Sequence, residues 1–335
     1  MKLYLEILDN KFPLLDLIAG KSRFNESNIS GLINKFQVRN IHNADVILIA
    51  HDAMHFAQEK KIIGFVSKIA ESKPVFIFDC GDKPVNLKIP NVFSLRNNFP
   101  PGQQVQNAIS IPYNVKSRSH LPTRELNVKP IVSFVGYVPK ILSRRLVPRN
   151  LNEFFHPIIN NGSIIRNLGL RQLHKNKHNT ILISRDHYGG ARSLIEDLTK
   201  FENEYEQSIM NSDLVFAPRG DANQSARFFE ILSAGRVPIL PDTSIRMPTI
   251  FMSDTNFVSI LVNASSNNIN EKISEFWEQM DEEIWREIQF KNKLVFEKCY
   301  SYPKFLNTLF SFDFSELKEN IIIANNLQEG ILSEK

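Results

Sequence analysis

The most informative stretch of the sequence is residues 205–248, and its central part, residues 213–240, reads DLVFAPRGDANQSARFFEILSAGRVPIL. The apolar runs at 214–217 and 237–240 predict two short buried strands, and the residues between them predict a helix over 224–234. Strands that are apolar throughout and are joined through a helix are typical of a parallel sheet covered on both faces. The stretch therefore predicts an α/β fold.

Both ends of the predicted 224–234 helix carry the residues expected there. Asn223 or Ser225 can cap its start by accepting a hydrogen bond from an early backbone N–H. Gly235 suits the position just after its end, where a positive φ is usual. The loop before the helix follows the carboxyl end of a strand, where α/β proteins bind phosphate. Arg219 lies in this loop and could pair with a phosphate through two N–H groups.

Arg227 and Glu230 lie three positions apart and therefore share one face of the predicted helix. A carboxylate beside Phe228, Phe229 and Ile231 is unusual on a packed helix. One role for it is to accept hydrogen bonds from the two hydroxyls of a ribose. The alternative is a weak Arg227–Glu230 ion pair on a solvated face, which is a common arrangement.

The same alternation of apolar runs and helical periodicity continues on both sides of this stretch. Helices are also predicted over 54–71, 202–211 and 269–290. The further predicted strands are 2–7, 44–50, 74–79, 91–95, 131–135, 180–184 and 257–260. Residues 114–130 are polar, basic and unpatterned, and they predict a linker between two α/β domains.

Length and composition agree with two soluble domains. A chain of 335 residues is long enough for two, at about 100–200 residues each. We expect an N-terminal acceptor-binding domain over 1–120, a donor-binding domain over 121–265, and C-terminal helices over 266–335 that pack back toward the first domain. With 40 basic and 36 acidic residues the net charge is +4, which is too small to favour a nucleic-acid partner.

Cys80 and Cys299 are too few for a disulfide framework or a Cys-rich zinc site, and we expect both to be reduced thiols packed as small hydrophobes. Glu6, Asp9 and Asn10 interrupt the N-terminus before a signal-type apolar run can form. No apolar stretch approaches the roughly 20 residues that span a bilayer. We therefore expect a cytoplasmic protein, with any membrane contact being peripheral at the inner face.

The central stretch also resembles the donor-binding segment of the exostosin-like glycosyltransferases, glycosyltransferase family 47. That segment runs as Pro-Arg-Gly, a short polar loop, Ser-x-Arg, Glu, and then Gly-x-x-Pro before a strand. The residues that match in order and spacing are Pro218-Arg219-Gly220, Ser225-Ala226-Arg227, Glu230 and Gly235-Arg236-Val237-Pro238. Tyr205 and Ser208 fit the family's run of Tyr and Ser ahead of the strand.

The resemblance is weaker upstream. A predicted strand ending near Gly136, followed by Arg144 and Arg145, looks like the family's opening of the donor domain. The predicted strand that leads to Arg185 fits its intermediate strand. The resemblance covers about residues 131–260, and the N-terminal half shows no motif of the family.

The resemblance implies a GT-B type architecture, with two Rossmann-like domains facing across a cleft. It implies transfer of a sugar from a nucleotide diphosphate sugar to a saccharide or glycolipid acceptor, in surface polysaccharide or glycan synthesis. Many retaining two-domain enzymes have a Glu where this sequence has Ala222, so an inverting outcome is favoured. No cofactor is implied. The implied donor-binding residues are Gly136, Arg144, Arg145, Arg185, Arg219, Gly220, Ser225, Arg227 and Glu230.

An inverting transferase needs a general base near the acceptor hydroxyl. His51 and Asp52 follow the predicted 44–50 strand at its carboxyl end and are the first candidates, while Asp79 and Asp82 follow the next strand. The alternative for Asp52 is a helix N-cap. Neither pair forms the Asp-x-Asp metal signature of the other major glycosyltransferase fold, so metal independence is expected.

The loop over 185–192 is basic, contains glycines and follows a strand, so it is a candidate for binding donor sugar or phosphate; the alternative is an exposed turn. The histidines within 174–178 have the spacing of a solvated loop rather than of a metal site. Trp277 and Trp285 lie at helical spacing and are expected in the core.

Two other functions share the donor motif. A protein could bind a nucleotide sugar without transferring it, or an epimerase could convert the sugar and release no nucleotide.

Overall fold

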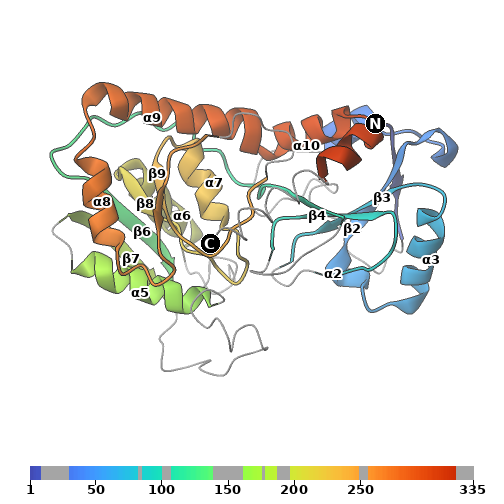
Figure 1. The fold of residues 1–335 in the computed structure, drawn as a ribbon, viewed down its shortest axis with the longest axis horizontal. Coiled ribbons are helices and arrows are strands. Elements are labelled where there is room, and N and C mark those ends of the chain that lie inside the picture. Colours follow the sequence, from blue (N-terminus) through green and yellow to red (C-terminus); the bar gives the residue numbers. More distant parts are fainter. Residues whose placement is uncertain are drawn as a thin grey trace. The chain divides into compact units, whose positions relative to one another are not determined.

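The computed structural model divides into two compact units. The first comprises Met1–Lys116, Arg246–Thr255 and Lys298–Lys335, and the second comprises Ser117–Ile245 and Asn256–Glu297. Each unit has its own five-stranded sheet, and every strand pair in both sheets is parallel (Figure 1). The predicted α/β class with two parallel-sheet domains is confirmed. The residues that the structure describes are 1–8, 30–81, 85–99, 107–138, 161–175, 178–186, 197–248 and 256–321.

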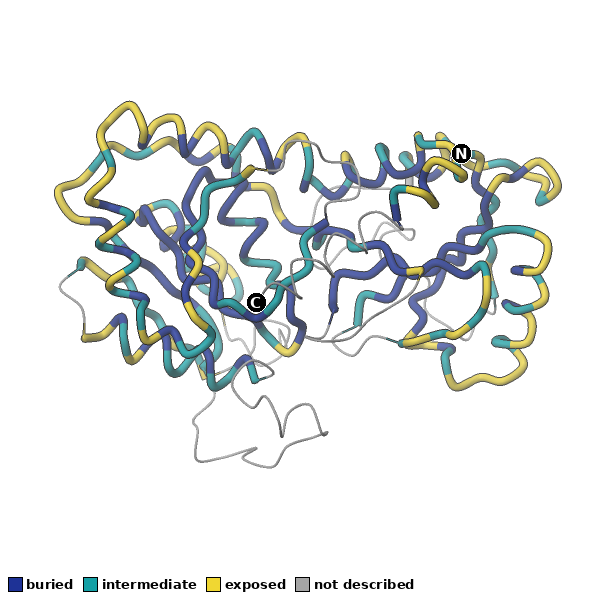
Figure 2. The backbone as a smooth tube through the Cα atoms, in the orientation of Figure 1, coloured by how far each residue is buried: buried dark blue, intermediate teal, exposed yellow. Residues whose placement is uncertain are grey.

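The strands of the first unit lie side by side in the order in which they occur along the chain. They are β1 (Leu3–Glu6), β2 (Val46–Asp52), β3 (Val75–Asp79), β4 (Val92–Arg96) and β5 (Ala108–Ser110). Every residue of β2, β3 and β4 is buried (Figure 2), as expected of strands covered on both faces. The sequence predicted the first four strands. It missed β5, whose three residues are too few to show a period.

Helices from both ends of the chain cover this first sheet. They are α1 (Ser30–Phe36), α2 (Ala53–Phe56), α3 (Lys60–Ala70) and α10 (Tyr302–Ser311). The predicted 54–71 helix is two helices, because the apolar period that supported it begins only at Ile62, within α3. Leu306 and Leu309 of α10 share a core with Leu3 and Val46, so the end of the chain completes the first unit.

The strand order of the second unit is β10-β9-β8-β6-β7. The strands are β6 (Ile131–Tyr137), β7 (Asn179–Arg185), β8 (Leu214–Phe216), β9 (Val237–Pro241) and β10 (Ile260–Val262). Within this unit β6 comes first in the chain, and β7 pairs with one side of it. The chain then crosses back, so that β8 pairs with the other side of β6. Because such crossovers are right-handed, the connections on the two sides of β6 lie on opposite faces of the sheet.

The helices of the second unit are α5 (Gly162–His174), α6 (Leu198–Met210), α7 (Ala226–Ser233), α8 (Ile269–Trp277) and α9 (Glu282–Val295). The predicted 269–290 helix is two helices, because Asp281 starts a new one by accepting a bond of 2.8 Å from the backbone N–H of Ile284. Both of these helices lie in the second unit, so residues 266–297 are not part of a separate C-terminal segment. No described helix has both the length and the apolar character that crossing a bilayer requires.

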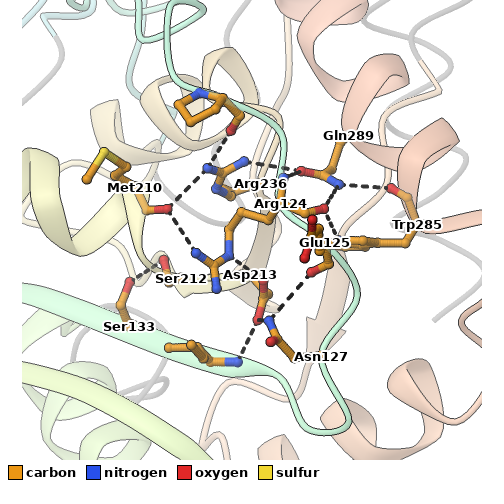
Figure 3. A network of polar contacts seen from close by, with 12 residues as sticks. Arg124, Glu125, Asn127, Ser133, Met210, Ser212, Asp213, Arg236, Trp285 and Gln289 are labelled. Carbon is orange, nitrogen blue, oxygen red and sulfur yellow. Dashed lines mark hydrogen bonds and ion pairs between the residues drawn. The ribbon is translucent and has the colours of Figure 1, made fainter. Parts of the chain in front are cut away.

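A network of buried polar contacts closes the amino end of this second sheet (Figure 3). Asp213 accepts bonds from Arg124 Nε at 2.6 Å and from the backbone N–H of Ile131 at 2.8 Å. Arg236 is fully buried and donates to backbone carbonyls and to the side chain of Gln289. Burial, and then the neighbouring charge of Arg124, lower the pKa of Arg236 to about 10. Residues 117–130 of the expected linker belong to the second unit, and this network fastens them there through Pro122 and Arg124.

Gly235 ends α7 with φ of +71°, and a Cβ built there would lie 2.8 Å from the backbone oxygen of Gln289. We expect Gly235→Ala to destabilise the protein by roughly 1–2 kcal/mol or more, because the left-handed region disfavours a Cβ and the site has no room for one. Gly64→Ala is the matched control, since nothing lies within 4 Å of that Cβ in α3 and alanine favours a helix. Urea unfolding should show a lower midpoint for the first variant and an equal or higher one for the second. A wild-type midpoint for Gly235→Ala would contradict this account of the turn.

Candidate functional site

The reversal of strand order between β6 and β8 brings the end of β6, at Tyr137, to the same carboxyl edge of the second sheet as the end of β8. The segment that follows β8 at this edge is Ala217–Gly220. Where strand order reverses in a parallel sheet, the two connections leave on opposite faces and open a crevice in which ligands bind. This edge contains most of the described residues that the sequence singled out.

Two glycines allow close packing at this edge. A Cβ on Gly162, the first residue of α5, would lie 2.2 Å from the backbone oxygen of Gly220 and 2.8 Å from that of Arg219. A Cβ on Gly136 would lie 2.6 Å from Nη2 of Arg227. The start of α5 therefore touches the loop after β8. Gly136 was predicted as a site residue, whereas Gly162 was not, since a single glycine far from the motif carries no signal of this contact.

Arginine side chains fasten the same loop. Arg219 is buried and its Nη2 donates to the backbone oxygen of Asp221 at 2.9 Å. Arg166 of α5 donates to the backbone oxygens of Arg219 at 3.2 Å and Tyr137 at 2.9 Å, so it joins the loop after β8 to the end of β6. Gly220 leaves space for this side chain, because a Cβ there would lie 3.2 Å from Nη2 of Arg166. Nothing in the sequence pattern marked Arg166.

The start of α7 lacks the predicted side-chain cap. Ser225 occupies the N-cap position, but its side chain accepts no hydrogen bond from the helix. Asn223 instead donates to the backbone oxygen of Thr243 at 3.0 Å. The prediction that one of them caps the helix is wrong, because the side chain of Asn223 is hydrogen-bonded to the loop after β9 instead. Neither side chain therefore caps α7. The N–H of Phe228 donates to the backbone oxygen of Ser225 at 3.1 Å, so the N–H groups of Ala226 and Arg227 are the ones at the helix start that an anion can accept from.

Arg227 and Glu230 on α7 point to different partners. Arg227 donates from Nη2 to the backbone oxygen of Val135 at 2.7 Å and lies 4.6 Å from the ring centre of Phe134. Glu230 accepts bonds from the hydroxyl of Tyr205 at 2.6 Å and from Nη2 of Arg118 at 3.4 Å. The alternative of a solvated Arg227–Glu230 pair is therefore wrong: the Glu230 carboxylate is only 17% exposed and its neighbours come from α6 and from the 117–130 segment.

Arg185 lies at the end of β7, beside this group. Its Nη2 donates to the backbone oxygen of Phe201 at 2.7 Å and to Glu204 at 3.1 Å, and its guanidinium lies 3.3 Å from the ring centre of Phe201. Burial lowers the pKa of Arg185, partly offset by Glu204. Arg144 and Arg145 lie outside the described residues. Of the expected binding loop over 185–192, only residues 185 and 186 are described.

In the first unit, the two residues predicted as a general base are both engaged with backbone. Asp52 caps α2 by accepting a bond of 3.0 Å from the N–H of Met54, and its other oxygen accepts one of 2.9 Å from Cys80. Burial raises the pKa of Asp52. His51 is fully buried, and its Nε2 accepts a bond of 3.2 Å from the N–H of Leu8. The N-cap interpretation of Asp52 is therefore confirmed, while a catalytic role stays a prediction.

Asp79, the next candidate, is also buried and lies 2.6 Å from Nη2 of Arg96. Burial raises the pKa of Asp79 to about 6, although the charge of Arg96 acts in the opposite direction. Asp82 lies outside the described residues. The part of the chain that the structure describes contains no group of three or more His, Cys, Asp or Glu side chains able to hold a metal ion.

No family model matches the sequence, and no curated protein matches it either. Among solved structures the chain is similar to TarM, with 14% identity over 82% of this chain and 52% of that one, and a TM-score of 0.36. It thus spans about half the length of TarM. It is also similar to Anabaena HepE in complex with UDP-glucose (11% identity, 100% of both chains, TM-score 0.36) and to a glycosyltransferase from Rickettsia africae (10%, 97% and 98%, 0.36). At such low identity and TM-score, the functions of these proteins do not transfer to this chain.

The contact at Gly162 gives a test of the edge as a binding site. We expect Gly162→Ala to weaken binding of a nucleoside diphosphate at least about fivefold, because the added methyl group displaces the Arg219–Gly220 backbone. Gly64→Ala on α3, which belongs to the first unit, is the matched control and should bind as the wild type does. Calorimetric titration measures the affinity, and circular dichroism verifies that both variants are folded. Unchanged affinity in a folded Gly162→Ala protein would show that the loop after β8 takes no part in ligand binding.

Proposed function

We propose that the protein is an exostosin-like glycosyltransferase that moves a sugar from a nucleotide diphosphate sugar to a saccharide or glycolipid acceptor. The observation that carries the proposal is the placement of Glu230 and Arg227 on α7, whose uncapped start follows the loop at the reversal of strand order. An anion site and a carboxylate one helical turn away suit a diphosphate and a ribose.

Each group has a distinct role in this proposal. The first N–H groups of α7 and the positive end of its dipole bind the diphosphate, and Arg219 holds the loop beside it. Arg227 adds positive charge: its Nε is buried and has no hydrogen-bond partner, so it retains a donor. Glu230 accepts bonds from the two ribose hydroxyls. Arg144 and Arg145 stay predicted contributors of charge.

In the proposed reaction, an acceptor hydroxyl oxygen attacks the anomeric carbon and forms the new glycosidic bond. The bond from that carbon to the β-phosphate oxygen breaks, and its electron pair leaves with the nucleoside diphosphate. Negative charge therefore grows on the β-phosphate, where the helix start and the arginines stabilise it more in the transition state than in the bound donor. Attack on the face opposite the leaving group inverts the anomeric carbon, and this scheme needs no metal.

The proton of the acceptor hydroxyl goes to a base that we place on the first unit. Asp52 suits this role better than His51. Each oxygen of the Asp52 carboxylate accepts one backbone bond and keeps a second lone pair, whereas Nε2 of His51 has already accepted the N–H of Leu8. The raised pKa of Asp52 also makes its carboxylate a stronger base than an exposed one.

The test is incubation with a panel of UDP-, GDP- and ADP-sugars, each with and without mono- and disaccharide acceptors. A transferase releases nucleoside diphosphate in proportion to a new glycoside. A binding protein without transfer activity forms a complex but no product, and an epimerase changes the sugar without releasing nucleotide. Either of these last two results would overturn the proposal.

Glu230→Gln sharpens this test, because it keeps the size of the side chain and removes its charge. We expect affinity for the nucleoside diphosphate to fall by about 1–3 kcal/mol, as charge-assisted bonds to the ribose weaken. Glu275→Gln on α8, which disrupts an exposed pair with Lys272, is the matched control and should leave affinity unchanged. Equal dissociation constants for Glu230→Gln and the wild type would show that the Glu230 carboxylate does not bind the nucleotide.

A further inference from the structure

The Glu230 carboxylate is held at both oxygens by residues that the expected donor motif does not assign to it. Oε2 accepts the hydroxyl of Tyr205 at 2.6 Å, and Oε1 accepts Nη2 of Arg118 at 3.4 Å. An ionised carboxylate can accept about four hydrogen bonds. Each Glu230 oxygen therefore accepts one hydrogen bond within the protein and can accept one more. Two further hydrogen bonds, one to each oxygen, are what two adjacent hydroxyl groups of a ligand could donate.

Tyr205 is a donor that does not lose its proton in the physiological range. Burial, and then the negative charge of Glu230, raise the pKa of the Tyr205 phenol. Its ring is fixed as well, since the guanidinium of Arg118 lies 5.1 Å from the ring centre and that of Arg227 lies 5.8 Å from it. The hydroxyl therefore holds Oε2 of Glu230 in one direction.

Arg118 is itself anchored at three points. Its backbone N–H donates to the hydroxyl of Ser233 at 2.9 Å, and that hydroxyl donates to the backbone oxygen of Glu230 at 2.7 Å. Its guanidinium pairs with Glu206 and Glu230. Although burial acts in the opposite direction, the charges of Glu230 and Glu206 raise the pKa of Arg118, so it stays a cation. Because these contacts hold the buried Arg118 side chain in one place, its guanidinium in turn holds Oε1 of Glu230 in place.

We propose that Tyr205 and Arg118 are positioning residues that direct the Glu230 carboxylate at the two hydroxyls of a ribose, which makes the site selective for ribonucleoside over deoxyribonucleoside diphosphates. The inference rests on the proposed function, because it presupposes a nucleoside diphosphate at this edge. It adds a selectivity for ribose over 2′-deoxyribose and two residues that determine this selectivity. Neither residue touches the ligand; both act through Glu230.

The experiment measures the dissociation constants of UDP, GDP and ADP, each beside its 2′-deoxy form, by calorimetric titration into the full chain. We expect the wild type to prefer the ribose form by about tenfold or more, the effect of one charge-assisted hydrogen bond. Tyr205→Phe keeps the ring and removes the hydroxyl, and it should reduce the preference to about two- to threefold. The affinity for the 2′-deoxy form should change by less than about twofold.

Arg118→Lys is the second variant. It keeps the charge, but a single ammonium cannot bridge Glu206 and Glu230 as a guanidinium does, so the preference should fall here as well. Tyr4→Phe is the matched control, a half-buried tyrosine of the first unit, and it should keep the wild-type preference.

The outcomes are distinct. An unchanged preference in both Tyr205→Phe and Arg118→Lys, or an equal loss of affinity for both nucleotide forms, overturns the inference and leaves the proposed function standing. Equal binding of both forms by the wild type overturns the inference together with the ribose role of Glu230. If the wild type binds none of the six nucleotides, the proposed function itself fails and the inference falls with it.

Discussion

The candidate site depends on one constraint of chain topology, the return of the chain from β7 across β6 to β8. This crossing sends consecutive connections to opposite faces of the second sheet and leaves the carboxyl ends of β6 and β8 adjacent. It also brings the start of α5 against the loop after β8, at a separation that only glycine permits at position 162. Arg166 then joins the end of β6 to the loop after β8 by donating to the backbone oxygens of Tyr137 and Arg219. In the first unit the described strands follow one another in order, so no such reversal occurs among them.

The two ends of the second sheet use polar groups in opposite ways. At the amino end, Asp213 and Arg236 take their partners from the chain itself, which fixes the 117–130 segment against α6 and α9 (Figure 3). At the carboxyl end, capacity is left over, at the uncapped start of α7, at Nε of Arg227 and on the Glu230 carboxylate. Buried polar groups with all bonds satisfied stabilise a fold, whereas groups with remaining capacity are what a ligand can bind. The functional assignment follows from this contrast.

Sequence alone located the strands well, because continuous apolar runs such as 44–50 and 74–79 have few other interpretations. It joined neighbouring helices wrongly, since periodicity does not reveal a break such as the one that Asp281 caps. The motif residues Arg219, Arg227 and Glu230 do gather at one edge. Their partners could not be predicted: Arg118 lies 112 positions from Glu230, and Arg166 lies 53 from Arg219, so only the folded chain brings them together.

Hydrogen exchange on the full chain tests most directly whether the reversal of strand order in the second unit is where a nucleoside diphosphate binds. Exchange is followed at each backbone amide with and without saturating UDP, GDP or ADP. The account predicts slower exchange at residues 219–221 and in the first turn of α7, where N–H groups would donate to the diphosphate. It predicts no change in the turn where Asp52 caps α2. Protection confined to the first unit, or absent from the start of α7 while a nucleotide is bound, would contradict it.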